Sequence, residues 1–320
     1  MVAPRKCCSS PESRYFHSVD MKIHYHVEGK GPLLICLHGG KGNSGDYFFP
    51  YLSPLADEMT MVYLDERGSG RSKPVSDKRL VSYEGMAADI DNLISHLGAE
   101  KAGILGHSFG SGLALYFALH YPHRMRELYV VCGGVSYPEI SRQGWYGRIY
   151  DEEMLQLNLA GEVQRVCDLY NSGKITADES FREQVKIQAP SIIYHWPEKR
   201  DEVYAVFART DFTFLGRENS NFGNEPEIHA DILARLGETR CPALILAGQQ
   251  DISCPLERLG AMARHIPSCE VRVIPRSKHF PFIDEPEIFV EMIRSFRRSS
   301  RLSDTSGRQI ARMDRQEGDH

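Results

Sequence analysis

The sequence predicts an α/β fold in which a mostly parallel eight-stranded sheet has helices on both faces. Short apolar runs alternate with helical patterns over residues 15–134 and again after residue 236. Several of these runs are apolar throughout, which is typical of strands buried on both faces of a parallel sheet. Residues 135–236 contain helical patterns and no buried strand. This break in the alternation indicates a helical insertion into the α/β core.

Composition limits the classes of protein to consider. The chain has 320 residues and a formal net charge of −5, with acids and bases interspersed, so we expect no nucleic-acid or membrane partner. The eight cysteines include no C-x-x-C pair, which argues against a zinc or redox site. No stretch has the pattern of a secretory signal or a membrane span. We therefore expect a cytoplasmic protein that acts on a small molecule.

The first elements are predicted to be a tail, a hairpin and a buried strand. Residues 1–14 are polar and are expected to be disordered. The alternating runs Tyr15–Val19 and Lys22–Val27 indicate a β-hairpin. Leu33–Leu37 is a continuous apolar strand that ends in a glycine-rich loop. That loop is either a flexible connection or a backbone donor, with the amide of Gly40 beside a reacting carbonyl.

The next segment supplies a second buried strand and a polar loop. Tyr47–Asp57 is predicted to be a kinked helix, and Met59–Leu64 is predicted to be a strand. Residues 65–72 combine glycines with charged side chains, which permits phosphate binding, but the Gly-Lys-Ser/Thr of a P-loop is missing. A structural loop held by Asp65 and Arg67 is the favoured interpretation.

A pentapeptide of the form G-x-S-x-G follows the third buried strand. A helix is predicted over Ser82–Leu97, and the apolar run Ala102–Leu105 then leads into Gly106-His107-Ser108-Phe109-Gly110. A second helix follows over Ser111–His120. Strand, sharp turn and helix are the context in which this motif exposes a nucleophilic serine. Taken alone, the motif also fits an ordinary glycine-containing turn.

The second half of the chain is predicted to contain the insertion and the remaining strands. Leu128–Cys132 is the strand before the insertion. Inside it, helices are predicted at Glu152–Leu159, Glu162–Tyr170, Glu179–Gln188, Asp201–Ala208 and Glu227–Leu236. Aromatic residues are dense there, and we expect Trp145, Trp196 and Phe222 to be among those that line a pocket beneath it. Strands at Ala243–Ala247 and Glu270–Ile274, with helices at Leu256–His265 and Pro286–Arg298, complete the fold.

The predicted organisation therefore has four parts. A disordered tail (1–14) precedes an α/β core made of residues 15–134 and 237–298. A helical cap (135–236) is inserted into that core, and a second disordered tail (299–320) follows it.

Three residues with complementary chemistry follow three of the predicted strands. They are Ser108, Asp251 and His279, in the chain order serine, acid, histidine. The carboxyl ends of parallel strands meet at one edge of a sheet, so we expect the three side chains to converge there. A serine needs a base to remove its proton, and a histidine base needs a carboxylate to orient it. The sequence therefore predicts a Ser-His-Asp catalytic triad.

These motifs together resemble an α/β-hydrolase with a helical cap, and specifically the proline iminopeptidase-like branch. The matching stretches are Leu37-His38-Gly39-Gly40, residues 65–72, the pentapeptide 106–110, Asp251 and His279. The resemblance spans about residues 15–298. It implies the α/β-hydrolase fold and an oxyanion hole formed by the amides of Gly40 and Phe109.

The chain departs from that branch where its aminopeptidases hold a substrate amine. Lys41 stands where the loop usually has proline, Ile252 replaces a glutamate after the triad aspartate, and Asn221 occupies the position of a cap glutamate. Glu218 or Glu225 are the available substitutes, and Glu218 is our candidate for substrate binding. A cationic amine needs a carboxylate partner in a buried pocket, so these departures weaken the peptidase interpretation.

The favoured hypothesis is a serine hydrolase that cleaves a small, largely apolar ester, lactone or amide through an acyl-enzyme. This chemistry requires no metal and no organic cofactor. Proline iminopeptidase activity is the alternative. A non-hydrolytic lyase or cyclase, or a ligand receptor on the same scaffold, remains open as a further alternative.

Overall fold

The computed structural model describes residues 11–75, 77–135, 159–196, 198–213 and 225–300. Eight strands in this part of the chain form one sheet, in the spatial order β1-β2-β4-β3-β5-β6-β7-β8. The first two pairings of the sheet, β1 with β2 and β2 with β4, are antiparallel, and the others are parallel. The strands are β1 (Glu12–Ser18), β2 (Met21–Gly29), β3 (Leu33–Leu37), β4 (Thr60–Leu64), β5 (Ala102–His107), β6 (Met125–Val131), β7 (Ala243–Gly248) and β8 (Cys269–Ile274). The predicted eight-stranded, mostly parallel sheet is therefore confirmed.

Successive side chains of the central strands enter two separate cores, one on each face of the sheet. Ile35 of β3 belongs to a core covered by α1 (Tyr83–His96), α2 (Phe109–His120), α9 (Glu225–Arg235) and α10 (Leu256–Ala263). Its neighbour Leu34 belongs to the other core, which includes residues from α11 (Pro281–Asp284) and the helix at 286–300. Both faces are covered, which explains why these strands are apolar at every position.

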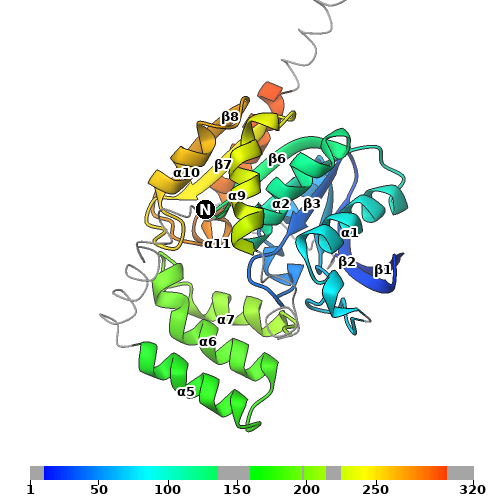
Figure 1. Cartoon of the computed structure of the whole chain (residues 1–320). Helices are drawn as coiled ribbons and strands as arrows, with labels where there is room; N and C mark the ends of the chain where they lie inside the picture. The colour runs from blue at the N-terminus through cyan, green and yellow to red at the C-terminus, as the bar shows by residue number, and fades with distance from the viewer. Residues whose placement is uncertain (1–10, 76, 136–158, 197, 214–224, 301–320) are drawn as a thin grey trace, which may run out of the picture.

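Three helices form a separate layer beside the sheet (Figure 1): α5 (Ala160–Asn171), α6 (Ala177–Ile192) and α7 (Arg200–Arg209). Val185 of α6 and Phe207 of α7 are buried in the core on the α11 face, so this layer is attached to the sheet by apolar contact. The helix α9 lies within the predicted cap range 135–236. It packs instead on the core, where Ile228 and Ile232 join the apolar cluster beside α2.

Two other local predictions are corrected by the structure. Residues 12–14 were assigned to the disordered tail, but they pair with β2, with Glu12 opposite Val27. Residues 12–14 are all polar and exposed, so this start of the strand shows no apolar alternation. The helix predicted over 47–57 is replaced by two 3₁₀ helices, η1 (Gly45–Phe48) and η2 (Ser53–Asp57). Prolines 50 and 54 lack the N–H groups that a continuous helix needs.

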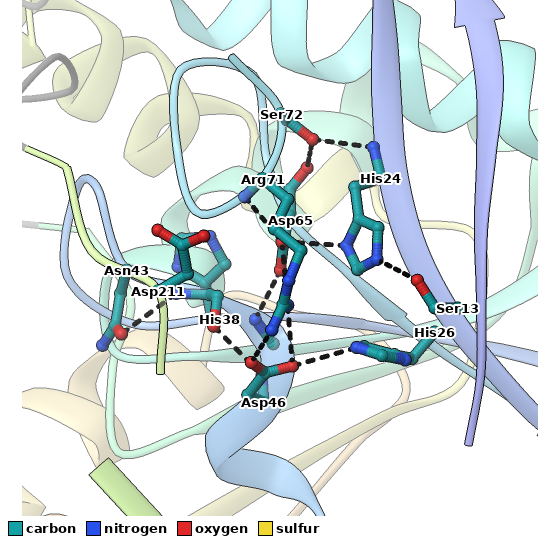
Figure 2. Close-up of polar contacts among 12 residues, drawn as sticks. Ser13, His24, His26, His38, Asn43, Asp46, Asp65, Arg71, Ser72 and Asp211 are labelled. Carbon is teal, nitrogen blue, oxygen red and sulfur yellow. Dashed lines mark hydrogen bonds and ion pairs between the residues drawn. The ribbon is translucent and has the colours of Figure 1, made fainter. Parts of the chain in front are cut away.

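The loop that follows β4 is held by buried polar contacts (Figure 2). The Asp65 carboxylate accepts hydrogen bonds from the amides of Gly45 and Arg71, each at 2.9 Å, and from His24 Nδ1 at 2.9 Å. Arg67 donates two hydrogen bonds to Asp89, at 2.9 and 2.7 Å. The interpretation of residues 65–72 as a structural loop is therefore confirmed. Within the described residues, no helix combines the length and apolar character of a membrane span.

Candidate active site

Ser108 occupies a strained turn between β5 and α2. Its φ of 52° and ψ of −115° lie outside the regions that a non-glycine residue normally adopts. The flanking glycines are required by close packing: a Cβ on Gly106 would lie 2.1 Å from the carbonyl oxygen of Gly110. A Cβ on Gly110 would lie 2.5 Å from the carbonyl oxygen of Leu37. The pentapeptide therefore forms the strand–turn–helix elbow that its sequence predicts.

The predicted acid and base reach Ser108 from the loops that follow β7 and β8. His279, which follows β8, has Nε2 3.0 Å from Ser108 Oγ and Nδ1 2.9 Å from Asp251 Oδ2. Asp251 follows β7, and its other oxygen accepts hydrogen bonds from the amides of Ser253 (2.8 Å) and Cys254 (3.1 Å). The structure therefore brings together all three residues, in the connectivity that a Ser-His-Asp triad needs.

The glycine-rich loop after β3 passes directly over the serine. A Cβ on Gly39 would lie 2.8 Å from Ser108 Cβ, so only glycine fits there. Gly40 has space around it, but its φ of +72° favours glycine for conformational reasons. Phe109 is the first residue of α2, where the helix dipole favours a negative charge. Both residues predicted for an oxyanion hole are thus next to Ser108, on the loop and on the helix start.

His38, at the start of this loop, is fully buried and anchors it. Its Nδ1–H donates to the Gly39 carbonyl at 3.3 Å, and its Nε2 accepts from the amide of Glu66 at 3.4 Å. Burial lowers the pKa of His38 to about 4. The side chain is therefore neutral, as a structural histidine would be.

A cavity of about 560 Å³ opens over Ser108 and His279. One face of α6 lines it, because Phe181, Val185, Gln188 and Ile192 recur at helical spacing. The remaining lining residues are Gly39, Gly40, Asn43, His107, Phe207, Ser253 and Phe280. None of these described residues is an acid, so the wall opposite the serine is largely apolar and uncharged.

Comparison with known proteins identifies the family to which this arrangement belongs. A family model described as "alpha/beta hydrolase fold" matches residues 32–286. The chain belongs to the α/β-hydrolase family. The matched residues include the elbow and the segments that carry Asp251 and His279.

Two relatives and one solved structure show the range of similarity. The hydrolase is 26% identical over 281 residues to "Putative carbamate hydrolase RutD" of Caulobacter sp. (strain K31), covering 85% of this chain and 94% of the relative. It is 25% identical over 285 residues to the proline iminopeptidase of Heyndrickxia coagulans, covering 85% and 92%. An alpha/beta fold family hydrolase from Bacillus anthracis str. Sterne superposes with a TM-score of 0.73 at 19% identity, covering 90% and 100%. These similarities confirm the predicted fold and the resemblance to the proline iminopeptidase-like branch.

Of the four residues predicted to bind substrate, one lies in the described part of the chain. Trp145, Glu218 and Phe222 lie outside the described residues. Trp196 is described, and it packs on Tyr204 with ring centroids 5.5 Å apart rather than lining the cavity. Its indole serves the contact with α7. A density of aromatic residues does not distinguish those that face a pocket from those that form a helical core.

The departures from the aminopeptidase pattern have a structural counterpart at Lys41. Its Nζ is 2.8 Å from Glu225 Oε2, so the residue that replaces the usual proline neutralises one of the two candidate acids. His229 Nε2 also lies 3.7 Å from the Glu225 carboxylate. Glu225 is not among the described residues of the cavity lining.

Two polar residues beside the elbow were missed by the sequence analysis. Tyr47 and His107 are fully buried and hydrogen-bonded to each other at 2.8 Å. His107 offered one signal, because a polar side chain directly after a buried strand needs a buried partner. Tyr47 offered none, since its hydroxyl meets the Gly39 amide and the distant His107 only after the loops have folded.

Proposed function

We propose that this α/β-hydrolase cleaves acyl compounds through a covalent acyl-serine intermediate. The observation that carries the proposal is the continuous contact from Ser108 Oγ to His279 Nε2 (3.0 Å) and from His279 Nδ1 to Asp251 (2.9 Å). His279 carries its Nδ1 proton toward the carboxylate, which leaves Nε2 free to accept the serine proton. The elbow exposes that serine to the cavity.

The reaction proceeds in two matched halves. Ser108 Oγ attacks the carbonyl carbon while its proton moves to His279 Nε2, and the amides of Gly40 and Phe109 stabilise the oxyanion. The bond to the leaving group then breaks, the leaving group takes the proton from His279, and the acyl group stays on Ser108. Water repeats the sequence, giving its proton to His279 and releasing the acid and the free serine.

The cavity lining favours a small, neutral and largely apolar substrate. Phe181, Val185 and Ile192 provide apolar contact for an acyl chain, and Gln188 is the polar exception on the same helix face. An ester, lactone or uncharged amide fits this lining. A carbamate is a further candidate substrate, because some relatives are named as carbamate hydrolases. The carbonyl carbon of a carbamate can be attacked by Ser108 in the same way as that of an ester.

Proline iminopeptidase activity is the second candidate, supported by the relatives of that name. Such a substrate carries a free ammonium group, which needs a carboxylate when it enters a buried pocket. Glu225 is already paired with Lys41 at 2.8 Å. The described part of the cavity lining contains no acid, so this candidate ranks second.

The test combines active-site labelling with a paired assay. Wild-type protein is expected to react with a fluorophosphonate probe and to hydrolyse p-nitrophenyl butyrate faster than proline p-nitroanilide. Ser108→Ala should lose the label and at least about 10⁴-fold in kcat, whereas the exposed Ser172→Ala should keep both. Labelling or turnover of Ser108→Ala at the wild-type level would overturn the proposal. Preferential cleavage of the anilide would replace the ester hypothesis with the peptidase one.

A further inference from the structure

A chain of hydrogen bonds runs beside the elbow and links three parts of the site. The amide of Gly39 bonds to Tyr47 Oη. Tyr47 Oη lies 2.8 Å from His107 Nδ1, and His107 Nε2 lies 2.8 Å from the carbonyl oxygen of His279. Both side chains are at most 1% exposed, so the geometry of these bonds is set by the protein and not by solvent.

Each bond in this chain has a defined direction. A carbonyl oxygen only accepts, so His107 Nε2 must carry the proton that it shares with His279. Burial lowers the pKa of His107 well below its usual value, so the ring is neutral and Nδ1 is an acceptor. Tyr47 therefore donates its hydroxyl proton to Nδ1, and its oxygen accepts from the Gly39 amide. Each donor has one acceptor. The three hydrogen bonds therefore connect the glycine-rich loop after β3 with the loop that carries His279.

The surroundings hold Tyr47 in one position. Its ring is stacked on Phe282 at an interplanar angle of 8° and a centroid distance of 5.9 Å. The amide of Gly45, two residues earlier, donates to the buried Asp65 carboxylate at 2.9 Å. The hydroxyl is thus delivered by a rigid ring on a fixed backbone, which is the support that a precise active-site geometry needs.

We propose that Tyr47 and His107 are positioning residues that lock the oxyanion loop, the nucleophile and the base to one another. Tyr47 fixes Gly39, which precedes the proposed oxyanion donor Gly40. His107 precedes Ser108 in the chain and holds the backbone of His279. The inference rests on the proposed function, because it assigns a catalytic consequence to the oxyanion loop. Preorganised donors stabilise a transition state more than a ground state, so losing this lock lowers kcat and spares KM.

The first test removes the Tyr47 hydroxyl and keeps the ring. Tyr47→Phe is expected to lower kcat for p-nitrophenyl butyrate about 10- to 100-fold, less than the loss of an oxyanion donor itself. KM should stay within about twofold, because the cavity wall is unchanged. Affinity for phenylboronic acid, which forms a tetrahedral adduct with the serine, should fall by the same factor as kcat. The matched control is Tyr63→Phe, a buried tyrosine whose hydroxyl bonds to Glu28 at 2.6 Å.

Two variants of His107 separate its two bonds. His107→Asn retains an acceptor near Nδ1 for Tyr47, and His107→Gln retains a donor near Nε2 for the His279 carbonyl. Each should lower kcat less than His107→Ala, and this partial rescue distinguishes a hydrogen-bonding role from simple filling of space. In Tyr47→Phe/His107→Gln, the loss should be smaller than the product of the two single losses, because both act on one chain.

The outcomes distinguish this inference from the function on which it rests. A folded Tyr47→Phe protein with wild-type kcat and boronate affinity would overturn the inference while the function stands. So would a fall in kcat matched by the Tyr63→Phe control, since that would reflect stability alone. A wild-type protein that neither labels with fluorophosphonate nor hydrolyses any acyl substrate would overturn the function, and the inference with it.

Discussion

Glu66 lies beside His38, at the start of the glycine-rich loop after β3, and its carboxyl group is buried without a hydrogen-bond partner for either oxygen among the described residues. Its Oε2 is 3.6 Å from His38 Nε2, beyond hydrogen-bond distance. Burial raises the pKa of Glu66 well above its usual value, and the neighbouring charge of Asp65 raises it further. The carboxyl group is therefore protonated in the folded protein under conditions where it ionises in the unfolded chain.

This residue makes stability depend on pH in a defined direction. The pKa of Glu66 is raised on folding, so the protonated carboxyl group favours the folded state. This contribution to stability is complete below the unfolded pKa of 4.5, and it is lost as pH rises through the pKa of Glu66 in the folded protein. Glu66→Gln cannot ionise, so it should match the wild type near pH 4 and exceed its unfolding free energy at pH 8. The difference should grow by about 1.4 kcal/mol per pH unit between the two pKa values.

Urea unfolding at pH 4, 6 and 8 measures this difference. The control is Glu100→Gln at an exposed acid, for which the difference from the wild type should stay near zero at every pH. Equal stability of Glu66→Gln and the wild type at pH 8 would show that Glu66 ionises freely in the folded state.

The sequence predicts which residues come together when each of them follows a predicted strand. Ser108 and Asp251 each follow an apolar run that predicts a strand, and His279 follows the predicted strand Glu270–Ile274, so their convergence could be inferred from topology. Glu66 and Tyr47 could not be assigned in the same way. Their buried state depends on side chains that meet only after the loops have folded.

At the scale of the element, α6 is the helix that forms most of the apolar cavity wall. It begins with a capping box in which Thr176 Oγ1 accepts from the Glu179 amide at 3.2 Å and Glu179 Oε2 accepts from the Thr176 amide at 2.7 Å. Phe181, the first lining residue of the helix, lies within the second turn. Order at the start of α6 therefore bears directly on the shape of the cavity.

Thr176→Ala should fray that turn and lower the unfolding free energy by about 1 kcal/mol, the usual cost of a lost N-cap. KM for apolar esters should rise, and kcat should change little because no triad residue lies on α6. Hydrogen exchange of the amides at 177–181 is expected to speed up, and Thr176→Ser should restore the slow exchange. Unchanged exchange in the alanine variant would mean that packing alone orders the first turns.

Element prediction was most accurate where burial imposed a pattern. The buried strands β3, β4 and β7 match their apolar runs to within one residue. The prediction was wrong at 47–57, where the apolar side chains have helical spacing but the prolines break the backbone hydrogen bonds. The sequence analysis included α9 in the cap range because no local pattern shows that this helix packs on the core. The residues that α9 contacts on α2 are about a hundred positions away in the sequence.

At the scale of the whole molecule, one carboxylate binds two segments that are far apart in the sequence: the residues just after α6 and the loop that carries His279. Asp284 Oδ1 accepts from the amides of Tyr194 (2.9 Å) and His195 (3.3 Å), and Oδ2 accepts from the amide of Lys278 (2.9 Å). The amide of His279 itself donates to the carbonyl of Ile192, the last residue of α6, at 3.1 Å. The loop that carries His279 is therefore positioned partly by the residues at and just after the end of α6.

Asp284→Ala should disturb stability and catalysis together. It leaves three partly buried backbone N–H groups without their acceptor, and a fully buried unsatisfied group costs about 1–3 kcal/mol, so we expect a loss of about 2 kcal/mol in unfolding free energy. The kcat for p-nitrophenyl butyrate should fall as well, because the loop that holds His279 loses one of its anchors. Asp284→Asn keeps one acceptor oxygen but turns an amide nitrogen toward an N–H group, so its losses should be intermediate.

Urea unfolding and steady-state kinetics on the same preparations test this link between docking and catalysis. The control is Glu287→Ala, an exposed acid three residues along, which should stay within about 0.5 kcal/mol of the wild type. If Asp284→Ala is destabilised but keeps the wild-type kcat, the helical layer does not position the base. In that case the contact of the His279 ring with Asp251 and of its backbone carbonyl with His107 would be sufficient to hold the residue in place.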